Sequence, residues 1–119
     1  MLMNTMTPQR RIQNIYTTAF APYDMDGPVE ADKSWLAISW SRETGRGCYL
    51  IRLQPGAETA PHEHTCLEEY LILEGDLVES DGTVLKPGDM VSYDQGTYHS
   101  SRTENGCLLV GFEWLPESN

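Results

Sequence analysis

The sequence predicts a single all-β domain with few helices. Its 119 residues can bury one hydrophobic core but not two. Short apolar runs follow one another at a spacing of roughly 8–12 residues, and almost every run ends at a turn that contains glycine. No stretch of about eleven or more residues keeps a clean 3.6-residue period. This combination is typical of a β-sandwich or a small β-barrel.

The N-terminal part of the chain is expected to lie outside the β domain. We expect residues 1–30 to be a flexible or irregular lead-in and residues 31–119 to form the domain. The lead-in begins with a polar segment and then contains the breakers Pro22, Gly27 and Pro28. It has no apolar segment of the kind found in secretory signals, so secretion is not expected.

The first three expected strands are residues 34–41, 47–53 and 69–73. The first alternates and is rich in aromatic residues, and the second contains β-branched and aromatic residues. A Thr-Gly turn separates them, and Gln-Pro-Gly follows the second. The third is a short apolar run that ends at Glu74-Gly75-Asp76.

Four further strands are expected in the second half of the chain. Asp81-Gly82 separates residues 77–79 from residues 83–86, and an Asp-Gly pair favours a tight hairpin. A Pro-Gly-Asp turn leads to residues 90–93, and the apolar residues 107–114 close the series.

The charge balance argues against two classes of partner. The chain has 8 Lys and Arg against 18 Asp and Glu, a formal net charge of −10. Nucleic acids and anionic lipid surfaces both bind through Lys and Arg, so neither partner is expected. No apolar run approaches the roughly 20 residues of a membrane-spanning helix.

The cysteines indicate a reducing compartment. Cys48, Cys66 and Cys107 lie far apart and form no C-x-x-C pair, so neither a disulfide framework nor a four-cysteine zinc site is expected. We therefore expect reduced thiols in a cytoplasmic protein. Cys66 lies among the metal-ligand candidates, where a thiolate can ligate or be oxidised, although an unreactive loop thiol is the simpler interpretation.

The histidines are the main chemical signal. The chain has three, and His62 and His64 are separated by one residue. Because side chains on a strand repeat every second residue, both imidazoles would face the same side. Glu68 has the same parity but would lie about 20 Å from His62 along a straight strand. One ion can bind both only if the chain bends at residues 65–67, and His99 would then join from a later hairpin.

Three imidazoles and one carboxylate suit one divalent metal ion per chain, such as Fe, Mn, Zn, Ni or Cu. Four protein ligands leave two positions open on an octahedral ion, whereas a structural tetrahedral site leaves none. Each residue alone has a simpler interpretation. A His-x-His pair is common on polar loops, Glu68 can be a solvated strand charge, and His99 can be a hydrogen-bonded edge residue.

The spacing of these residues resembles the cupin superfamily. Gly56-(x)5-His62-x-His64-(x)3-Glu68-(x)6-Gly75 is similar to the first cupin motif, and Gly88-(x)5-Asp94-x-Gly96-(x)2-His99 to the second. Two positions depart from the pattern, because Asp94 replaces a usual proline and Thr103 a usual asparagine. The resemblance implies a double-stranded β-helix, the cupin jelly-roll barrel, with His62, His64, Glu68 and His99 binding a metal in one mouth. The six-residue spacing to Gly75 also indicates Glu68, and not Glu69, as the metal ligand.

Within the superfamily, residues 62–75 resemble the ChrR-like cupins. We consider three functions, of which the resemblance implies the first two and metal chemistry suggests the third. The first is a dioxygenase-type oxidoreductase for a small diketone or acid, and the second is a zinc-binding sensor or regulatory module without turnover. The third is a metal-assisted isomerase, lyase or hydrolase. It ranks last because phosphorylated substrates need cations, and the sequence offers few near the site: Arg52, Lys86 and Arg102.

The resemblance also suggests a substrate pocket and a dimer. Candidate lining residues are Tyr49, Tyr70, Met90 and Phe112, and Tyr98 is a candidate to place a hydroxyl near the metal. Core packing is the alternative for each of them. A homodimer is expected to cover exposed sheet edges, through the outward face near Leu71 and Leu73 or through residues 35–40.

Overall fold

A computed structural model describes residues 9–25 and 27–115, and within them the chain forms strands and no helix. All strand pairs are antiparallel. In chain order the strands are β1 (Ala21–Pro22), β2 (Lys33–Ala37), β3 (Gly47–Leu53), β4 (His62–Glu63), β5 (Leu67–Gly75), β6 (Leu77–Glu79), β7 (Val84–Leu85), β8 (Met90–Tyr93), β9 (Tyr98–His99), β10 (Ser101–Arg102) and β11 (Cys107–Trp114). The prediction of an all-β domain is therefore confirmed. The described residues include no helix that is long and apolar enough to span a membrane.

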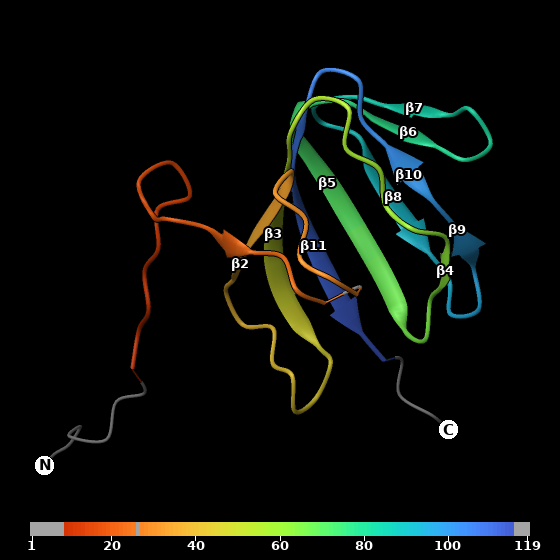
Figure 1. Ribbon diagram of the computed structural model, residues 1–119. Coiled ribbons are helices and arrows are strands. Elements are labelled where there is room, and N and C mark those ends of the chain that lie inside the picture. Colours follow the sequence, from red (N-terminus) through yellow and green to blue (C-terminus); the bar gives the residue numbers. More distant parts are fainter. Residues whose placement is uncertain (1–8, 26, 116–119) are drawn as a thin grey trace, which may run out of the picture.

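The strands form one large sheet and two small ones. The large sheet has the order β1-β2-β3-β11-β5-β8, and the small sheets are β10-β6-β7 and β4-β9. Figure 1 shows the short strands of the small sheets beside β5 and β8, away from β2 and β3. The inner faces enclose the core, which is the arrangement of a jelly-roll barrel. The buried core residues are Trp35, Tyr49, Leu53, Ala57, Tyr70, Ile72, Leu77, Leu85, Tyr93, Cys107 and Leu109.

The register of the large sheet places functional residues at one end of its inner face. In β11, Leu109 pairs with Ile51 and Ile72, and the three form an aliphatic row. Two residues further along β11, Gly111 pairs with Tyr49 and Tyr70. Two residues further again, Glu113 pairs with Glu68. Because alternate residues face the same side, the inner face changes from aliphatic to tyrosine to carboxyl along the strands.

The expected strand bounds are confirmed where glycine turns delimit them. Residues 47–53, 77–79, 90–93 and 107–114 have the bounds that the sequence predicts. The hairpin at Asp81-Gly82 is also present, with Gly82 at a φ of 90°. Residues 69–73 lie within the longer strand β5, and β7 is shorter than expected.

The strand expected at residues 34–41 corresponds to β2, which ends at Ala37 and is therefore shorter than predicted. The backbone N–H groups of Ile38, Ser39 and Trp40 all point to the carbonyl oxygen of Cys48, at 2.9, 3.0 and 3.1 Å. Because three successive N–H groups share one acceptor, the chain turns away from β3 after Ala37 and the pairing of β2 with β3 ends there. Gly47 permits this curl, since a Cβ on it would lie 2.4 Å from the Ser39 carbonyl oxygen.

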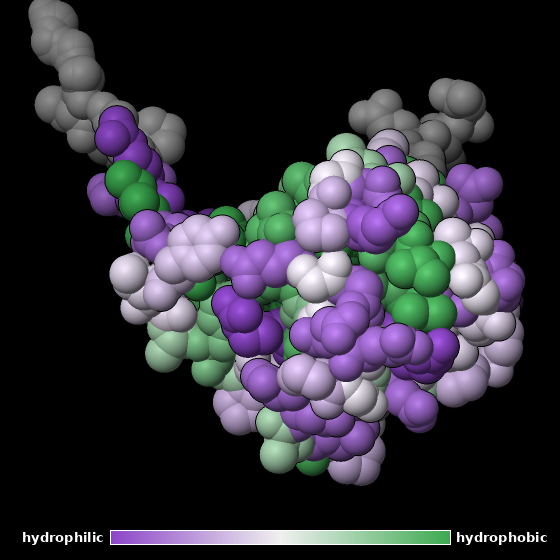
Figure 2. All heavy atoms as spheres, turned by 90° about the horizontal axis from the view of Figure 1, so that it is seen from above, coloured by the Kyte–Doolittle hydropathy of each residue, from purple (hydrophilic) through white to green (hydrophobic). Residues whose placement is uncertain are grey.

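The strands that the sequence did not predict, β1, β4, β9 and β10, have two residues each, too few to show a period. β1 pairs with β2, and the ring of Tyr23 lies edge-on to Trp35 at 5.6 Å. The end of the expected lead-in is thus attached to the sheet, and the boundary at residue 30 stays a prediction. Figures 1 and 2 show the described residues before β1 extending away from the body. Residues 1–8 lie outside the described part of the chain.

Candidate metal centre

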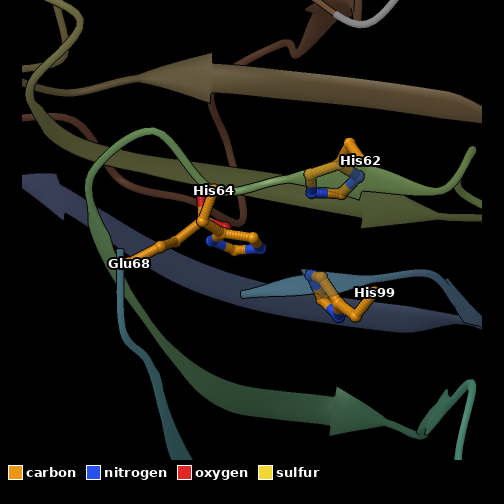
Figure 3. A group of neighbouring side chains, drawn as sticks. All are labelled: His62, His64, Glu68 and His99. Atoms are coloured by element: carbon orange, nitrogen blue, oxygen red, sulfur yellow. The ribbon is translucent and has the colours of Figure 1, made fainter. Parts of the chain in front are cut away.

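The structure brings together the four residues that the sequence singles out. One ligand atom from each of His62, His64, Glu68 and His99 lies within 4.8 Å of the others. His62 and His99 are direct partners in the β4-β9 pair, and the His64 and His99 rings are 4.6 Å apart. Figure 3 shows the three imidazoles gathered together, with His62 on β4, His64 on the segment that follows β4 and His99 on β9, and with Glu68 reaching the group from β5. The carboxylate reaches the histidines because the chain bends at Thr65 and Cys66, as the spacing predicts.

Each imidazole has its Nδ1 atom within reach of an acceptor. His62 Nδ1 lies 2.9 Å from the carbonyl oxygen of Ala60, and His64 Nδ1 lies 3.1 Å from Glu68 Oε1. His99 Nδ1 lies 3.2 Å from Glu79 Oε1. An Nδ1–H donor at each of these places would leave the lone pair on Nε2, and this is the tautomer that binds a metal through Nε2.

The Nε2 atoms of His64 and His99 are buried and have no hydrogen-bond partner among the described residues. Buried polar atoms are nearly always satisfied, so two orphaned nitrogens in one cluster point to a missing partner. A divalent ion fits them, because each presents a lone pair. Burial and then the neighbouring His99 and His62 lower the pKa of His64 to about 4. Its imidazole is therefore neutral and able to ligate at neutral pH.

Two tyrosines hold Glu68 in the group. Tyr49 and Tyr70 both donate their hydroxyls to its carboxylate, Tyr70 over 2.9 Å. Burial first, and the adjacent Glu68 carboxylate among the other causes, raise the pKa of both tyrosines well above the usual value, so both hydroxyls remain donors. Glu69 lies on the opposite face of β5, where its Oε1 accepts a hydrogen bond of 3.3 Å from the Trp114 indole.

The sequence reasoning missed Glu79, which supports His99. Its carboxylate accepts hydrogen bonds from the hydroxyls of Tyr93 and Ser101 and faces His99 Nδ1. A carboxylate behind a ligating histidine fixes the ring and raises its basicity. Strand parity agrees with this position, because Glu79 lies two positions after Leu77 on β6, which the structure shows to be fully buried.

The sequence reasoning also missed Glu113, whose carboxyl lies at the same cavity opposite Glu68. Burial, followed by hydrogen bonding and charge from Glu68, raises the pKa of Glu113 to about 7. Cys66 Sγ is 3.6 Å from Glu113 Oε2, and burial raises the pKa of that thiol to about 11. Cys66 is therefore a neutral thiol at neutral pH.

Replacing Glu113 should remove a pH dependence of stability. Between its usual pKa near 4.5 and its folded value near 7, the folded state holds a proton that the unfolded state releases, so Glu113 reduces stability as pH rises. Glu113→Gln should match the parent protein at pH 5 and exceed its stability by about 1 kcal/mol at pH 8, with the full shift reduced by solvent screening. Urea unfolding of the metal-free proteins measures this. A parallel pH profile for the two proteins would contradict it.

The cluster opens on a cavity of about 200 Å³. Tyr49 and Tyr70 line it, whereas Met90, Phe112 and Tyr98 do not. Those three side chains are 64%, 37% and 69% exposed, so their expected placement in the pocket is corrected. The cause is parity. Met90 is three residues from Tyr93 on β8, so the two side chains face opposite sides of the strand, and Tyr93 is the one that faces inward. Phe112 lies between positions 111 and 113 of β11, which face the cavity, and therefore faces outward. Tyr98 precedes His99 on β9 and faces the opposite side.

Comparison with known proteins supports the same fold. The sequence matches the ChrR cupin-like domain over residues 18–115, and a search of curated proteins finds no match. The fold is similar to a chain of the Rhodobacter sphaeroides complex between SigE and the anti-sigma factor ChrR, with a TM-score of 0.68 at 15% identity over 86% of this chain and 52% of that one. It is similar to an acetylacetone dioxygenase from Acinetobacter johnsonii, with a TM-score of 0.65 at 16% identity over 93% and 80%. It is also similar to the polyketide cyclase RemF from Streptomyces resistomycificus, with a TM-score of 0.70 at 20% identity over 88% and 80%.

At these identities the structural likenesses show a common fold, and the identity of the family comes from the sequence match. That match spans all the strands, both glycine-framed motifs and all four clustered residues. The resemblance that the sequence suggests is therefore confirmed, and the chain belongs to the ChrR cupin-like domain family.

Proposed function

We propose that this chain is a metal-dependent enzyme for a small molecule, most simply a dioxygenase-type oxidoreductase. His62, His64, Glu68 and His99 would hold one divalent metal ion. The observation that carries the proposal is the pair of orphaned, buried Nε2 atoms in a cluster that lines a cavity. A site that served structure alone would not need a cavity large enough for a ligand beside it.

The chain's own residues suit that role. A bound divalent ion would supply Lewis acidity, and a redox-active one such as iron would also exchange electrons with dioxygen. Tyr49 and Tyr70 orient Glu68, and the side chains of Ile51, Leu53 and Leu109 limit water on the aliphatic side of the cavity. Glu113 holds a carboxyl of pKa about 7 at the same cavity, where it can accept or return a proton at neutral pH.

A zinc-binding regulatory module without turnover is the second candidate. The sequence match to the ChrR cupin-like domain and the likeness to a chain of the SigE–ChrR complex favour it. This function would need the same four ligands, so the cluster by itself supports both candidates. The metal that the protein retains and its reactivity with dioxygen separate them.

Metal analysis of untagged protein tests the proposal, with His62→Ala as the ligand variant. Glu58→Ala is the matched control, because Glu58 is an exposed carboxylate that does not line the metal cavity. About one iron or manganese per chain, lost in His62→Ala and kept in the control, supports the oxidoreductase. Oxygen uptake with Fe(II) and a panel of dicarbonyl and phenolic compounds should follow. Stoichiometric zinc without oxygen uptake favours the regulatory module, and absence of metal from all three proteins would overturn both.

We also expect a homodimer through the outer face of the large sheet. An apolar row crosses five strands of that face in register: Leu36, Leu50, Val110, Leu71 and Met90. Leu50 is already buried within the chain, and the other four side chains are partly or fully exposed. The alternative surface at residues 35–40 is less suited, because Trp35 packs into the core. Light scattering should give twice the chain mass of 13.4 kDa, and Leu71→Glu should give the monomer. A parent protein of monomer mass would contradict this expectation. A cytoplasmic location stays a prediction.

A further inference from the structure

A buried lysine lies at the same cavity as the metal cluster. Lys33 on β2 is 8% exposed and lines the cavity together with His62. The acidic side chains at this cavity are Glu63, Glu68 and Glu113. Lysine is rarely buried without a functional or structural partner, because its charge is costly to remove from water. Lys33 therefore gives the cavity a cationic end in a protein whose net charge is −10.

Strand register places this cation far from the carboxyl end of the cavity. Lys33 pairs with Leu53 of β3, whereas Glu113 pairs with Gly47, six residues earlier on the same strand. Six residues span about 20 Å of strand between the backbones, and the side chains of Lys33 and of the four clustered residues line the cavity that lies between them. Lys33 instead lies on the side of His62, because it shares a small side chamber with Thr59 and Ala60, and the Ala60 carbonyl oxygen contacts His62 Nδ1.

The ion pairs of Lys33 leave it able to bind a ligand. Its Nζ lies 3.1 Å from Glu30 Oε1 and 3.5 Å from Asp32 Oδ1, and these carboxylates are 62% and 40% exposed. Pairs with such exposed carboxylates are weak because water screens them. An ammonium group has three N–H donors, so it can also bind an oxygen that enters from the cavity. An anion bound there would be desolvated, which makes a charge-assisted hydrogen bond stronger.

The three cationic residues that the sequence suggested near the site do not serve this role. Arg52 lies over the Phe20 ring at 5.4 Å, and Arg102 pairs with Glu104 over 2.8 Å. Lys86 is exposed, and none of the three lines the metal cavity. The sequence did not indicate Lys33 as a cavity residue, because it lies in a polar segment at the start of a strand, where a lysine usually points to solvent.

We propose that Lys33 binds the carboxylate of the substrate. The inference rests on the proposed function and narrows it. The substrate is a short carboxylic acid that also carries an oxo or hydroxyl group, with the carboxylate at Lys33 and the second oxygen function at the cluster of His62, His64, Glu68 and His99. Aliphatic side chains of Ile51, Leu53, Leu77 and Leu109 line the same cavity, and its volume of about 200 Å³ limits the acid to a short carbon chain. An acid is therefore preferred over a neutral dicarbonyl compound.

Two probes of the same skeleton test this inference by calorimetric binding to the full chain loaded with one equivalent of Zn(II). Pentane-2,4-dione carries the dicarbonyl group alone, and in 2,4-dioxopentanoate a carboxylate replaces one of its terminal methyl groups. The parent protein should bind the acid at least about tenfold more tightly than the dione. Lys33→Met should reduce this ratio to about one and leave the affinity for the dione unchanged. Lys86→Met, the change of the other lysine in the chain, should keep the full ratio.

Two further variants guard against a folding defect in Lys33→Met. Lys33→Arg retains the charge and should retain the preference for the acid. Glu30→Gln removes an exposed competitor for the lysine and should tighten binding of the acid a few-fold. A parent protein that binds both probes equally, or a preference that survives in Lys33→Met, would overturn the role of Lys33 while the metal-dependent function stands. If neither probe binds, the role of Lys33 and the proposed metal-dependent function are both overturned.

Discussion

Glu79→Ala should lower the affinity of the protein for a divalent metal by about 10- to 100-fold, although Glu79 is not itself one of the four proposed ligands. The reason is its position behind His99. With the carboxylate in place, His99 Nδ1 is held as the donor and Nε2 faces the cluster. Without it, the ring can rotate or take the other tautomer, and it loses the negative charge that increases its basicity.

The same substitution should cost about 3 kcal/mol of folding free energy. Glu79 accepts hydrogen bonds from Tyr93 and Ser101 as well as facing His99, and all three of these residues are buried. Removing the shared acceptor leaves several buried donors unsatisfied, at about 1–3 kcal/mol each before relaxation. Competition with a fluorescent zinc chelator measures the affinity, and urea unfolding of the metal-free protein measures the stability.

Two companion variants separate this effect from a general loss of charge. Glu58→Ala removes a carboxylate from an exposed position and should change neither quantity. Glu79→Gln keeps the size of the side chain but replaces one acceptor oxygen with a donor, so it should give an intermediate loss of both. A full metal affinity in Glu79→Ala would show that His99 needs no orienting partner.

The four clustered residues and several strands could be predicted because they depend on local signals. Gly75 and Gly96, with φ values of 79° and 94°, stand at turns that the motif spacing already marks. Between such turns the strand bounds follow directly, as for residues 47–53. The bend that returns Glu68 to the histidines could also be predicted, because one ion cannot bind residues at the two ends of a straight strand.

The residues around the cluster could not be predicted in the same way. Glu79, Tyr93 and Ser101 meet because β6, β8 and β10 approach one another in space, and no spacing in the sequence encodes that contact. Met90 and Phe112 were placed in the pocket on their apolar character, although strand parity directs both outward. Parity becomes informative only once one residue of each strand is known to face inward, and the structure supplies that residue.

Gly111 has no side chain, and it supports the cluster by leaving space for the ring of Tyr49. A Cβ on this residue would lie 2.5 Å from Cζ of Tyr49 and 2.6 Å from its hydroxyl oxygen. Tyr49 is 3% exposed and packs against Trp35, so its ring has little room to move. The space over Gly111 is therefore where the tyrosine lies when its hydroxyl reaches Glu68.

Gly111→Ala should consequently cost about 2 kcal/mol of folding free energy, the usual scale for overpacking a core. It should also weaken metal binding, because a displaced Tyr49 no longer orients Glu68. The matched experiment is a double-mutant cycle with Tyr49→Ala, which removes the ring that the new methyl group would strike. If the clash is the cause, Gly111→Ala costs little in the Tyr49→Ala background, and the two changes are strongly non-additive. Additive losses of stability would instead assign the role of Gly111 to its backbone.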